Sequence, residues 1–304
     1  MSTPRTRVLF VAGYERSGST LIQNVIAQAL SMCAVGELRE VWKAGLLENR
    51  PCGCSRPFNE CPIWQSVMEK AFGTLTEAQA RHLCEMSHRV RTRLFPLTLL
   101  PGSDHFFKHL LGDYPAALKA LYDSRARRDD GATLVDTSKS PVYAYVLKRL
   151  AGLDVRILHV VRDVRGVTHS ILKRRDQGHA GYANYSPLRV AIEWMITNKA
   201  VEWTTTKTGC PYRRIRYESF VSDPESALRG VFDWMGETEE PLDYVYHQQV
   251  KLSNTHTVVG SPSRFNTGTI QLRLDDKWRD ALSRSTRKTL ERWTAPTLRS
   301  YGYA

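Results

Sequence analysis

The fold is decided by the stretch Val8-Leu-Phe-Val-Ala-Gly13-Tyr-Glu-Arg16-Ser-Gly18-Ser-Thr20-Leu. A short apolar run, typical of a buried strand, breaks into a Gly/Ser turn, and residues 21–30 then space their apolar side chains as a helix does. This order of elements directs successive backbone N–H groups and the positive end of a helix dipole at one point. The turn fits Gly-x4-Gly, but Ser19 stands where a nucleotide triphosphatase has lysine, and the cation is Arg16, inside the turn. The stretch therefore predicts an anion-binding loop with a displaced cation.

The other strand patterns indicate the fold class. Further apolar runs at 132–136, 155–161 and 212–217 are separated by helical patterns, as in a parallel sheet covered on both faces. We therefore predict an α/β fold, a P-loop-like three-layer sandwich with a central parallel sheet. One domain over 1–304 is the simplest account of this length. The mostly helical segment at about 40–130 is predicted to be an insertion that covers one side of the site.

The charge balance favours an acidic partner without indicating nucleic acid. The formal net charge is +12, which suits a polyanionic small molecule, an anionic membrane surface or nucleic acid, and equally a solvated surface rich in arginine. The basic clusters at 125–128 and 173–175 are short, so we expect no nucleic-acid partner. No apolar run has the length of a membrane span, and the first strand pattern leaves no room for a signal peptide. We expect a cytoplasmic protein.

Cysteine usage does not indicate a secreted disulfide framework. Three of the six cysteines, Cys52, Cys54 and Cys61, lie in one short loop. A zinc site would need a fourth ligand, and the nearest candidates in sequence lack a diagnostic spacing: His82, Cys84 and His88. We therefore expect no metal and a compact loop of reduced or paired thiols, with zinc as the alternative that metal analysis tests.

A second informative stretch is Asp154-Val-Arg-Ile-Leu-His-Val-Val-Arg162-Asp-Val-Arg165-Gly-Val-Thr-His-Ser170. Its apolar run ends at Arg162, which places a guanidinium at the carboxyl edge of the sheet, where open α/β folds bind ligands. A helix is expected just after it, with Ser170 about two turns in. Arginine suits a phosphate because its planar fork donates two hydrogen bonds, although an arginine at a strand end also pairs with carboxylates.

Together, the Arg16 loop and the stretch from Arg162 to Ser170 resemble two motifs of the sulfotransferases that use 3′-phosphoadenosine 5′-phosphosulfate (PAPS). A third stretch, Tyr217-Glu218…Asp223-Pro224…Phe232-Asp-Trp-Met-Gly236, is similar to a further segment of that family. The stretches around Lys139 and Arg264, and the loop 52–64, resemble features of its bacterial and carbohydrate-type branches. The resemblance spans most of the chain.

The resemblance implies a binding site for PAPS, or for its product PAP. The residues that it assigns to the 5′-phosphosulfate are Arg16, Ser17, Gly18, Ser19 and Thr20. Those that it assigns to the 3′-phosphate, the group that distinguishes PAPS from ATP, are Arg162, Ser170 and, as a second ligand, Arg264. It assigns Tyr217 to the adenine ring, and a core aromatic at a strand end is the alternative for that residue.

The chemistry of sulfuryl transfer suggests roles for further residues. The reaction needs an in-line nucleophile and cations beside the equatorial and leaving oxygens, as phosphoryl transfer does. Arg16 is placed for the departing phosphate and Lys139 for the sulfuryl oxygens, so no metal is required. The predicted general base is Glu37, expected on a second short strand, with Glu40 and His159 as rivals. An ion pair between Glu37 and an arginine is the structural alternative.

The sequence therefore predicts an enzyme that moves the sulfuryl group of PAPS to a hydroxyl of a small-molecule acceptor: a carbohydrate, a lipid-linked compound or a phenolic or other secondary metabolite. The alternative is an ATP-dependent P-loop kinase, in which Asp136 would imitate a magnesium-binding partner. The insertion at 40–130 and the loop 176–187 are predicted to shape the acceptor pocket, with Phe106, Phe107, Tyr182 and Tyr185. Oligomeric state is left open, with a homodimer as one alternative.

Overall fold

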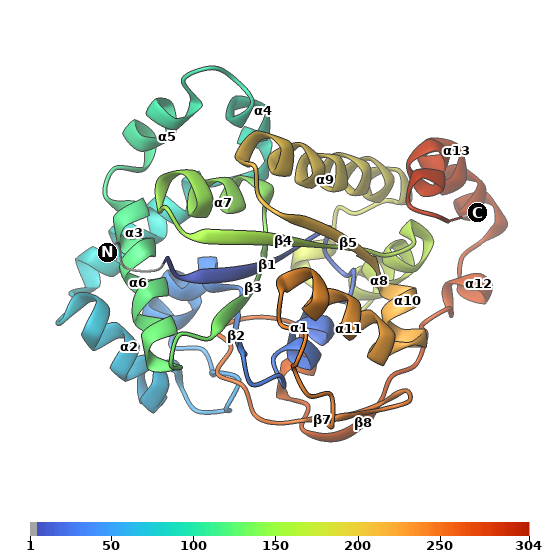
Figure 1. The fold of residues 1–304 in the computed structure, drawn as a ribbon. Helices are drawn as coiled ribbons and strands as arrows, with labels where there is room; N and C mark the ends of the chain where they lie inside the picture. The colour runs from blue at the N-terminus through green and yellow to red at the C-terminus, as the bar shows by residue number, and fades with distance from the viewer. Residues whose placement is uncertain (1–4, 304) are drawn as a thin grey trace.

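The computed structural model describes residues 5–303 and contains a five-stranded parallel sheet between layers of helices (Figure 1). In spatial order the strands are β2 (Met32–Gly36), β3 (Thr133–Lys139), β1 (Arg7–Ala12), β4 (Asp154–Val161) and β5 (Tyr212–Arg216). The predicted fold class is confirmed. Because β1 lies between β3 and β4, the loop that follows it opens at the middle of the carboxyl edge of the sheet.

Strand β1 illustrates why helices cover both faces of this sheet. Phe10 packs into one core cluster and Leu9 and Val11 into another, and all three side chains are fully buried. A continuous apolar run is typical of a parallel strand that is covered on both sides.

The layer against Leu9 and Val11 combines three helices with a small antiparallel sheet, seen below the main sheet in Figure 1. Its elements are α1 (Ser19–Ile26), α10 (Tyr217–Ser222), α11 (Pro224–Met235), β6 (Val245–Tyr246), β7 (Gln249–Leu252) and β8 (Gly268–Gln271).

The opposite layer is formed largely by the helical segment expected at about 40–130. Its elements are the π-helices η2 (Val41–Leu47) and η5 (Val146–Leu150), and the helices α2 (Pro62–Phe72), α3 (Glu77–Arg89), α4 (Phe95–Thr98), α5 (Ser103–Leu111), α6 (Tyr114–Arg128) and α7 (Pro141–Tyr145). Trp64 and Leu118 of this segment share one core cluster with Phe10 of β1, so the segment packs directly on the sheet.

A third cluster covers the end of β4, beside the C-terminus. It is built from α8 (Val164–Asp176), α9 (Pro187–Thr208), α12 (Trp278–Ala281) and α13 (Arg284–Ser300). Short 3-10 turns complete the secondary structure: η1 (Leu38–Glu40), η3 (Phe58–Glu60), η4 (Thr92–Leu94), η6 (Ala180–Tyr182) and η7 (Pro262–Phe265).

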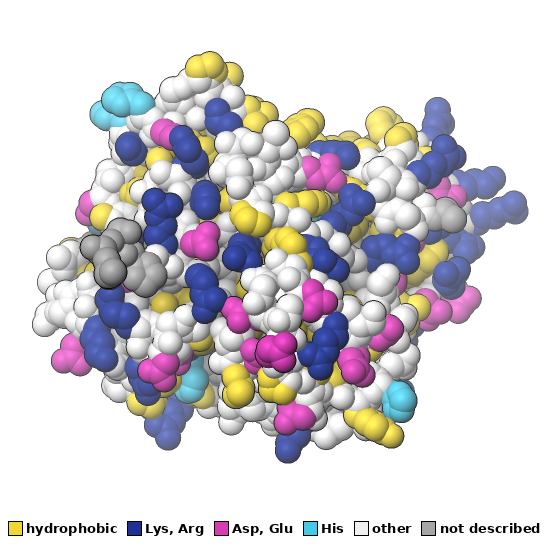
Figure 2. All heavy atoms as spheres, viewed as in Figure 1, with side chains coloured by type: hydrophobic (Ala, Val, Ile, Leu, Met, Phe, Trp, Pro, Cys, Tyr) yellow, Lys and Arg dark blue, Asp and Glu magenta, His cyan; other side chains and the backbone are white. Residues whose placement is uncertain are grey.

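The surface charges do not form a single stripe on the face drawn in Figure 2. Lys and Arg side chains are scattered there among acidic and apolar ones, with one group at the right-hand edge, where α12 and α13 lie in Figure 1. Within residues 5–303, no helix is both long and apolar enough to cross a membrane.

Candidate active site

A cavity of about 530 Å³ lies at the carboxyl edge of the sheet. It collects side chains from the β1–α1 loop, the ends of β2, β3 and β4, helix α8, the start of α10 and the segment 260–263. The residues that line it are Glu15, Arg16, Gly18, Ser19, Thr20, Leu21, Glu37, Lys139, Arg162, Arg174, Tyr182, Tyr217, Gly260, Ser261, Pro262 and Ser263. Most residues singled out from the sequence therefore meet in one place.

The β1–α1 loop is shaped for an anion by its backbone. Gly18 caps α1 with a φ of 88°, and a Cβ at this position would lie 2.4 Å from the Tyr217 ring. Arg16 also has a left-handed backbone, with a φ of 64°, which is uncommon outside glycine and is often found at functional sites. The first turn of α1 carries no acidic residue and no side-chain cap, so its N–H groups remain available to a ligand.

The hydroxyls of this loop lie in three different settings. Ser19 and Thr20 are buried and line the cavity, and the Thr20 hydroxyl accepts a hydrogen bond from the backbone N–H of Ser261. Ser17 is buried beside the cavity, and its hydroxyl has no hydrogen-bond partner among residues 5–303. The loop thus retains polar groups that the protein itself does not satisfy.

Arg162 connects several parts of the site. Its guanidinium donates to the backbone oxygen of Arg16 at 3.2 Å and to the carboxylate of Asp275 at 2.9 Å, and it lies over the Tyr217 ring at 4.5 Å. Arg16 in turn donates from Nε to the Ser170 hydroxyl at 3.0 Å. Arg162 and Ser170, which were predicted to act on one phosphate, are therefore linked through Arg16.

Four cationic side chains converge on the cavity: Arg16, Lys139, Arg162 and Arg174. Burial lowers the pKa of Arg16, and the positive charges of Arg174 and Arg162 lower it further, while Tyr182 and Glu15 oppose the shift. The mutual repulsion of these cations is relieved when a polyanion binds among them. The site therefore favours a ligand with several negative charges.

Glu37 and Lys139 form an ion pair on the wall of the same cavity. Glu37 lies one residue past β2, where the sequence predicted it on the strand itself, and Lys139 ends β3 with a φ of 62°. Both side chains are roughly three-quarters buried, at 24% and 21% exposure. A carboxylate and an ammonium thus face each other beside the β1–α1 loop, and the ion-pair partner of Glu37 is a lysine where the sequence suggested an arginine.

The two rivals of Glu37 lie elsewhere. Glu40 does not line the cavity, and its nearest cation is Arg39 at 3.9 Å. His159 is fully buried between the Tyr212 hydroxyl and the Asn198 amide oxygen, each 2.9 Å from a ring nitrogen. Burial lowers the pKa of His159 to about 4, so the ring is neutral at neutral pH.

Two further candidate residues have structural partners. The buried guanidinium of Arg264 donates to the backbone oxygens of Val258 and Pro51, at 2.7 and 2.8 Å, and does not line the cavity. The Asp136 carboxylate, in the middle of β3, is fully buried and accepts hydrogen bonds from the Tyr122 hydroxyl and the Ser138 N–H.

Sequence reasoning missed other residues at the site. Arg174 lies four positions after Ser170 on α8, a helical spacing that could have placed both on one face. Tyr182, expected near the acceptor, lines the cavity and donates to Glu15 at 3.1 Å. The segment 260–263 overlaps the stretch around Arg264 that the resemblance singled out, but the resemblance gave a role only to Arg264. Asp275, the carboxylate beside Arg162, had no signal, because its closeness depends on the folded tail.

The remaining aromatic candidates lie outside the cavity. Tyr185 packs against Tyr182 with ring centroids 5.6 Å apart. Phe107 is buried in the core, whereas Phe106 is half exposed. No residue between 40 and 130 lines this cavity, so the predicted contribution of that segment to an acceptor pocket stays a prediction.

Comparison with known proteins identifies the family of this chain. No curated protein sequence matches the chain. A solved sulfotransferase, STF9 from Mycobacterium avium, is 11% identical with a TM-score of 0.50, over 99% of this chain and 78% of that one. The sulfotransferase domain from the curacin biosynthetic pathway is 18% identical with a TM-score of 0.49, over 99% and 100% of the two chains. Residues 9–241, which include the loop, Glu37, Lys139, Arg162 and Tyr217, match the model of the sulfotransferase family, and the chain belongs to that family.

Proposed function

We propose that this sulfotransferase transfers the sulfuryl group of PAPS to a hydroxyl of a small-molecule acceptor. The observation that carries the proposal is the convergence of Arg16, Lys139, Arg162 and Arg174 on one cavity beside a loop whose N–H groups are available. A donor with a 5′-phosphosulfate and a 3′-phosphate needs two anion sites on one protein surface. The link from Arg162 through Arg16 to Ser170 supports two adjacent sites.

The donor fits the loop through residues of this chain. The N–H groups of α1 and the hydroxyls of Ser19 and Thr20 would bind the 5′-phosphosulfate, with Arg16 beside the bridging oxygen. Arg162 and Ser170 would bind the 3′-phosphate, and a neighbouring cavity that contains Ser170, Lys173 and Arg174 supports this placement. Tyr217, whose ring is packed against Gly18, would offer a flat surface to the adenine.

The proposed reaction is an in-line displacement at sulfur. The acceptor oxygen forms a bond to sulfur as the bond between sulfur and the phosphate oxygen of PAPS breaks, which releases PAP and a sulfate ester. Glu37 takes the proton of the acceptor hydroxyl, and Arg16 neutralises the charge that develops on the departing phosphate. Lys139 forms an ion pair with Glu37 and would stand beside the sulfuryl oxygens.

The kinase alternative loses its candidate magnesium partner. Asp136 is hydrogen-bonded within the core and does not face the cavity. Burial raises its pKa to about 6, which opposes the ionised form that would bind magnesium. The P-loop lysine is also replaced by Ser19. The site therefore favours a donor that is neutralised by fixed cations.

The cavity wall and the cysteines support a class of acceptor and a class of compartment. Tyr182 and Glu15, which are hydrogen-bonded to each other at the cavity wall, are the residues that we expect to contact the acceptor. A carbohydrate, a lipid-linked compound or a phenolic metabolite suits such a mixed wall. None of the six cysteines forms a disulfide, which agrees with a reducing compartment such as the cytoplasm.

Binding of PAP, ADP and ATP without magnesium tests the proposal by calorimetry. We expect PAP to bind most tightly, and Arg162→Ala to weaken PAP by roughly 10- to 150-fold while it changes ADP by only a few-fold, because charge-assisted hydrogen bonds contribute about 1.5–3 kcal/mol. Arg156→Ala is the matched control, since Arg156 lies on β4, close in sequence to Arg162, and its guanidinium donates to the Met235 oxygen away from the cavity. Preference for ATP, or equal losses for PAP and ADP, would contradict the proposal.

A further inference from the structure

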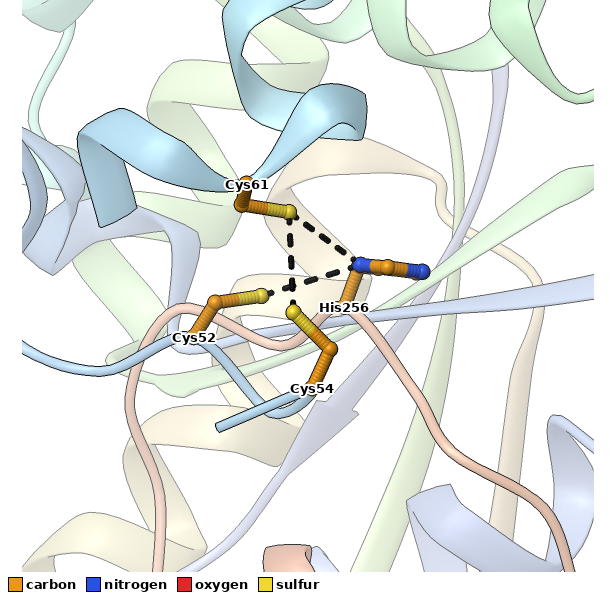
Figure 3. Close-up of side chains that lie close together, drawn as sticks. All are labelled: Cys52, Cys54, Cys61 and His256. Carbon is orange, nitrogen blue, oxygen red and sulfur yellow. Dashed lines mark hydrogen bonds between the residues drawn. The ribbon is translucent and has the colours of Figure 1, made fainter. Parts of the chain in front are cut away.

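Four potential metal ligands meet at a point that the proposed reaction does not use. Cys52, Cys54 and Cys61 belong to the loop between η2 and α2, and His256 comes from a segment 195 residues after Cys61. In Figure 3 the three sulfur atoms and the Nδ1 atom of His256 point toward one another. All four ligand atoms lie within 4.8 Å of one another, and no other such group is found within residues 5–303.

We propose that Cys52, Cys54, Cys61 and His256 bind one structural zinc ion. Thiolate sulfur and imidazole nitrogen are the ligands that zinc takes in closed tetrahedral sites, and three cysteines with one histidine are an established set. Because four protein ligands fill the tetrahedron, no position is left for water or substrate. The ion would therefore serve the fold, and the inference is independent of the proposed reaction.

The distances agree with one ion at the centre of the group. With Zn–S of about 2.3 Å and Zn–N of about 2.0–2.1 Å, tetrahedral geometry separates two sulfurs by ~3.8 Å, and a sulfur from a nitrogen by ~3.6 Å. The sulfurs of Cys54 and Cys61 are 3.8 Å apart, and the His256 Nδ1 atom is 3.2 Å from Cys61 and 3.8 Å from Cys52. A disulfide would need two sulfurs about 2.0 Å apart.

The loop that carries the cysteines is held in shape by its own backbone. The N–H of Cys52 donates to the Arg56 oxygen at 2.7 Å, and the N–H of Ser55 donates back to the Cys52 oxygen at 2.8 Å. This tight turn brings Cys52 and Cys54 to the same side. Cys61 immediately precedes Pro62, the first residue of α2. The local backbone thus brings the three thiols toward one another.

The distant histidine is also held in place by contacts of its own segment. Its backbone oxygen accepts from the Trp64 indole at 2.9 Å, and the next residue, Thr257, accepts from the N–H of Gly53 at 2.9 Å. A Cβ on Gly53 would lie 2.6 Å from the Thr255 oxygen, so only glycine allows the two segments to pass this closely. These contacts orient His256 toward the cysteines rather than leaving it on a free loop.

Burial and access suit a structural ion. Cys52 and Cys61 are fully buried, whereas Cys54 and His256 are partly exposed. His256 also lines a second cavity of about 530 Å³, together with Cys33 and Arg125, so the cluster borders this cavity at its histidine. Two ligands inside the core and two at its edge are compatible with an ion that binds as the chain folds.

Metal analysis of the full chain, purified without a histidine tag or chelator, tests the proposal. We expect about one zinc per chain in the wild type, and less than a tenth of that in His256→Gln. His88→Gln is the matched control, because His88 also lies beside a cysteine, at 4.0 Å from Cys84, but outside the cluster. Cys54→Ser and Cys84→Ser repeat the comparison for the thiols.

A second measurement uses the wild type alone, in case a variant does not fold. Cobalt(II) added to chelator-treated protein is expected to give the visible bands of tetrahedral cobalt and thiolate-to-cobalt charge transfer in the near ultraviolet, and zinc is expected to abolish both. Absence of zinc and of these bands would overturn the proposal. Equal loss of zinc in His256→Gln and in the control His88→Gln would overturn it too. A disulfide between any two of the three cysteines, detected by non-reducing peptide mass analysis, would overturn it as well.

Discussion

The cation-lined cavity and the cysteine–histidine cluster both include residues of one tail segment, but their polar groups are arranged in opposite ways. In the cavity, cations and N–H groups surround a space of about 530 Å³. In the cluster, four ligand atoms surround a point, all within 4.8 Å of one another. The first arrangement suits a large polyanion that comes and goes, and the second suits one small ion that stays.

The two regions are joined by a short run of backbone. From His256 the chain passes Val258, whose N–H donates to the Val35 oxygen of β2, and Val259, whose oxygen accepts from the N–H of Glu37. It then reaches Gly260–Ser263, which lines the cavity. These contacts hold the run between the cluster and the cavity wall against β2, so a change in either region can be tested for its effect on the other.

The largest expected effect comes from Glu37→Gln, which acts only on the cavity. Removing a general base typically lowers turnover by about 10²- to 10⁴-fold. PAP affinity is expected to stay within a few-fold, because Glu37 does not belong to the anion loop, and zinc content is expected to stay unchanged. Steady-state kinetics with labelled PAPS, PAP calorimetry and metal analysis measure the three quantities.

Glu40→Gln is the control for this change, since Glu40 follows closely in the chain but lies outside the cavity. Near-normal turnover in Glu37→Gln would refute the role of Glu37 as base. Loss of zinc in the same variant would mean that the cavity supports the cluster, which reverses the dependence inferred from the backbone contacts.

The second prediction distinguishes two effects of a side chain at Gly18: a steric clash with the Tyr217 ring and the strain of a left-handed backbone. Gly18→Ala places a Cβ 2.4 Å from the Tyr217 ring at a φ of 88°, so the loop or the ring must move. A shift of the N–H groups is expected to weaken PAP by roughly 10- to 100-fold, which corresponds to about 1.4–2.8 kcal/mol. Calorimetry with PAP measures the loss.

Gly209→Ala is the matched control, because Gly209 has a φ of 66° and nothing within 4 Å of the added Cβ. Both variants carry the cost of a left-handed alanine, about 1–2 kcal/mol of stability. Only Gly18→Ala is expected to weaken PAP. Equal affinities in the two variants would show that the contact between Gly18 and Tyr217 does not set the shape of the loop.

The comparison also explains what the sequence could predict. The strand, loop and helix around Arg16 are contiguous, so their sequence pattern predicted both the fold class and the position of the β1–α1 loop. Arg162 and Ser170 were found for the same reason, since a strand end and the helix after it are local features. Glu37 and Lys139 were placed near the site because the carboxyl ends of parallel strands share one edge.

The residues that were missed depend on contacts between distant segments. His256 lies in a polar tail that carries no metal-binding spacing, and its role appears only when that tail packs on the loop of Cys52 and Cys61. Asp275 reaches Arg162 across 113 residues of chain. Arg264 was assigned to a phosphate from its motif, whereas its guanidinium ties the same tail to Pro51 and Val258. The residue types alone could point to the tail segment, whereas the contacts that these residues make depend on tertiary packing.

The third effect runs from the cluster to the cavity. If zinc anchors the tail, removing it with a chelator is expected to loosen Gly260–Ser263 and to weaken PAP by roughly 3- to 10-fold, or about 1 kcal/mol. Returning zinc is expected to restore the affinity, whereas magnesium is not, because thiolates prefer the softer ion. Unchanged PAP affinity in verified zinc-free protein would show that Arg264 and the backbone contacts hold the wall without the ion.

The smallest expected effect is a gain in PAP affinity, whereas the other substitutions lower affinity or turnover. Burial raises the pKa of Asp275, but its hydrogen bond with Arg162 outweighs this and leaves the pKa below the usual range, so the carboxylate is ionised at neutral pH and competes with a phosphate for Arg162. Asp275→Asn removes the charge and keeps the shape, and PAP is expected to bind roughly 2- to 5-fold more tightly. Asp276→Asn, at an exposed neighbour whose nearest cation is Arg279 at 4.0 Å, is the control and is expected to leave PAP affinity unchanged. Weaker PAP binding in Asp275→Asn would mean that the carboxylate orients Arg162 toward the phosphate instead of competing with it.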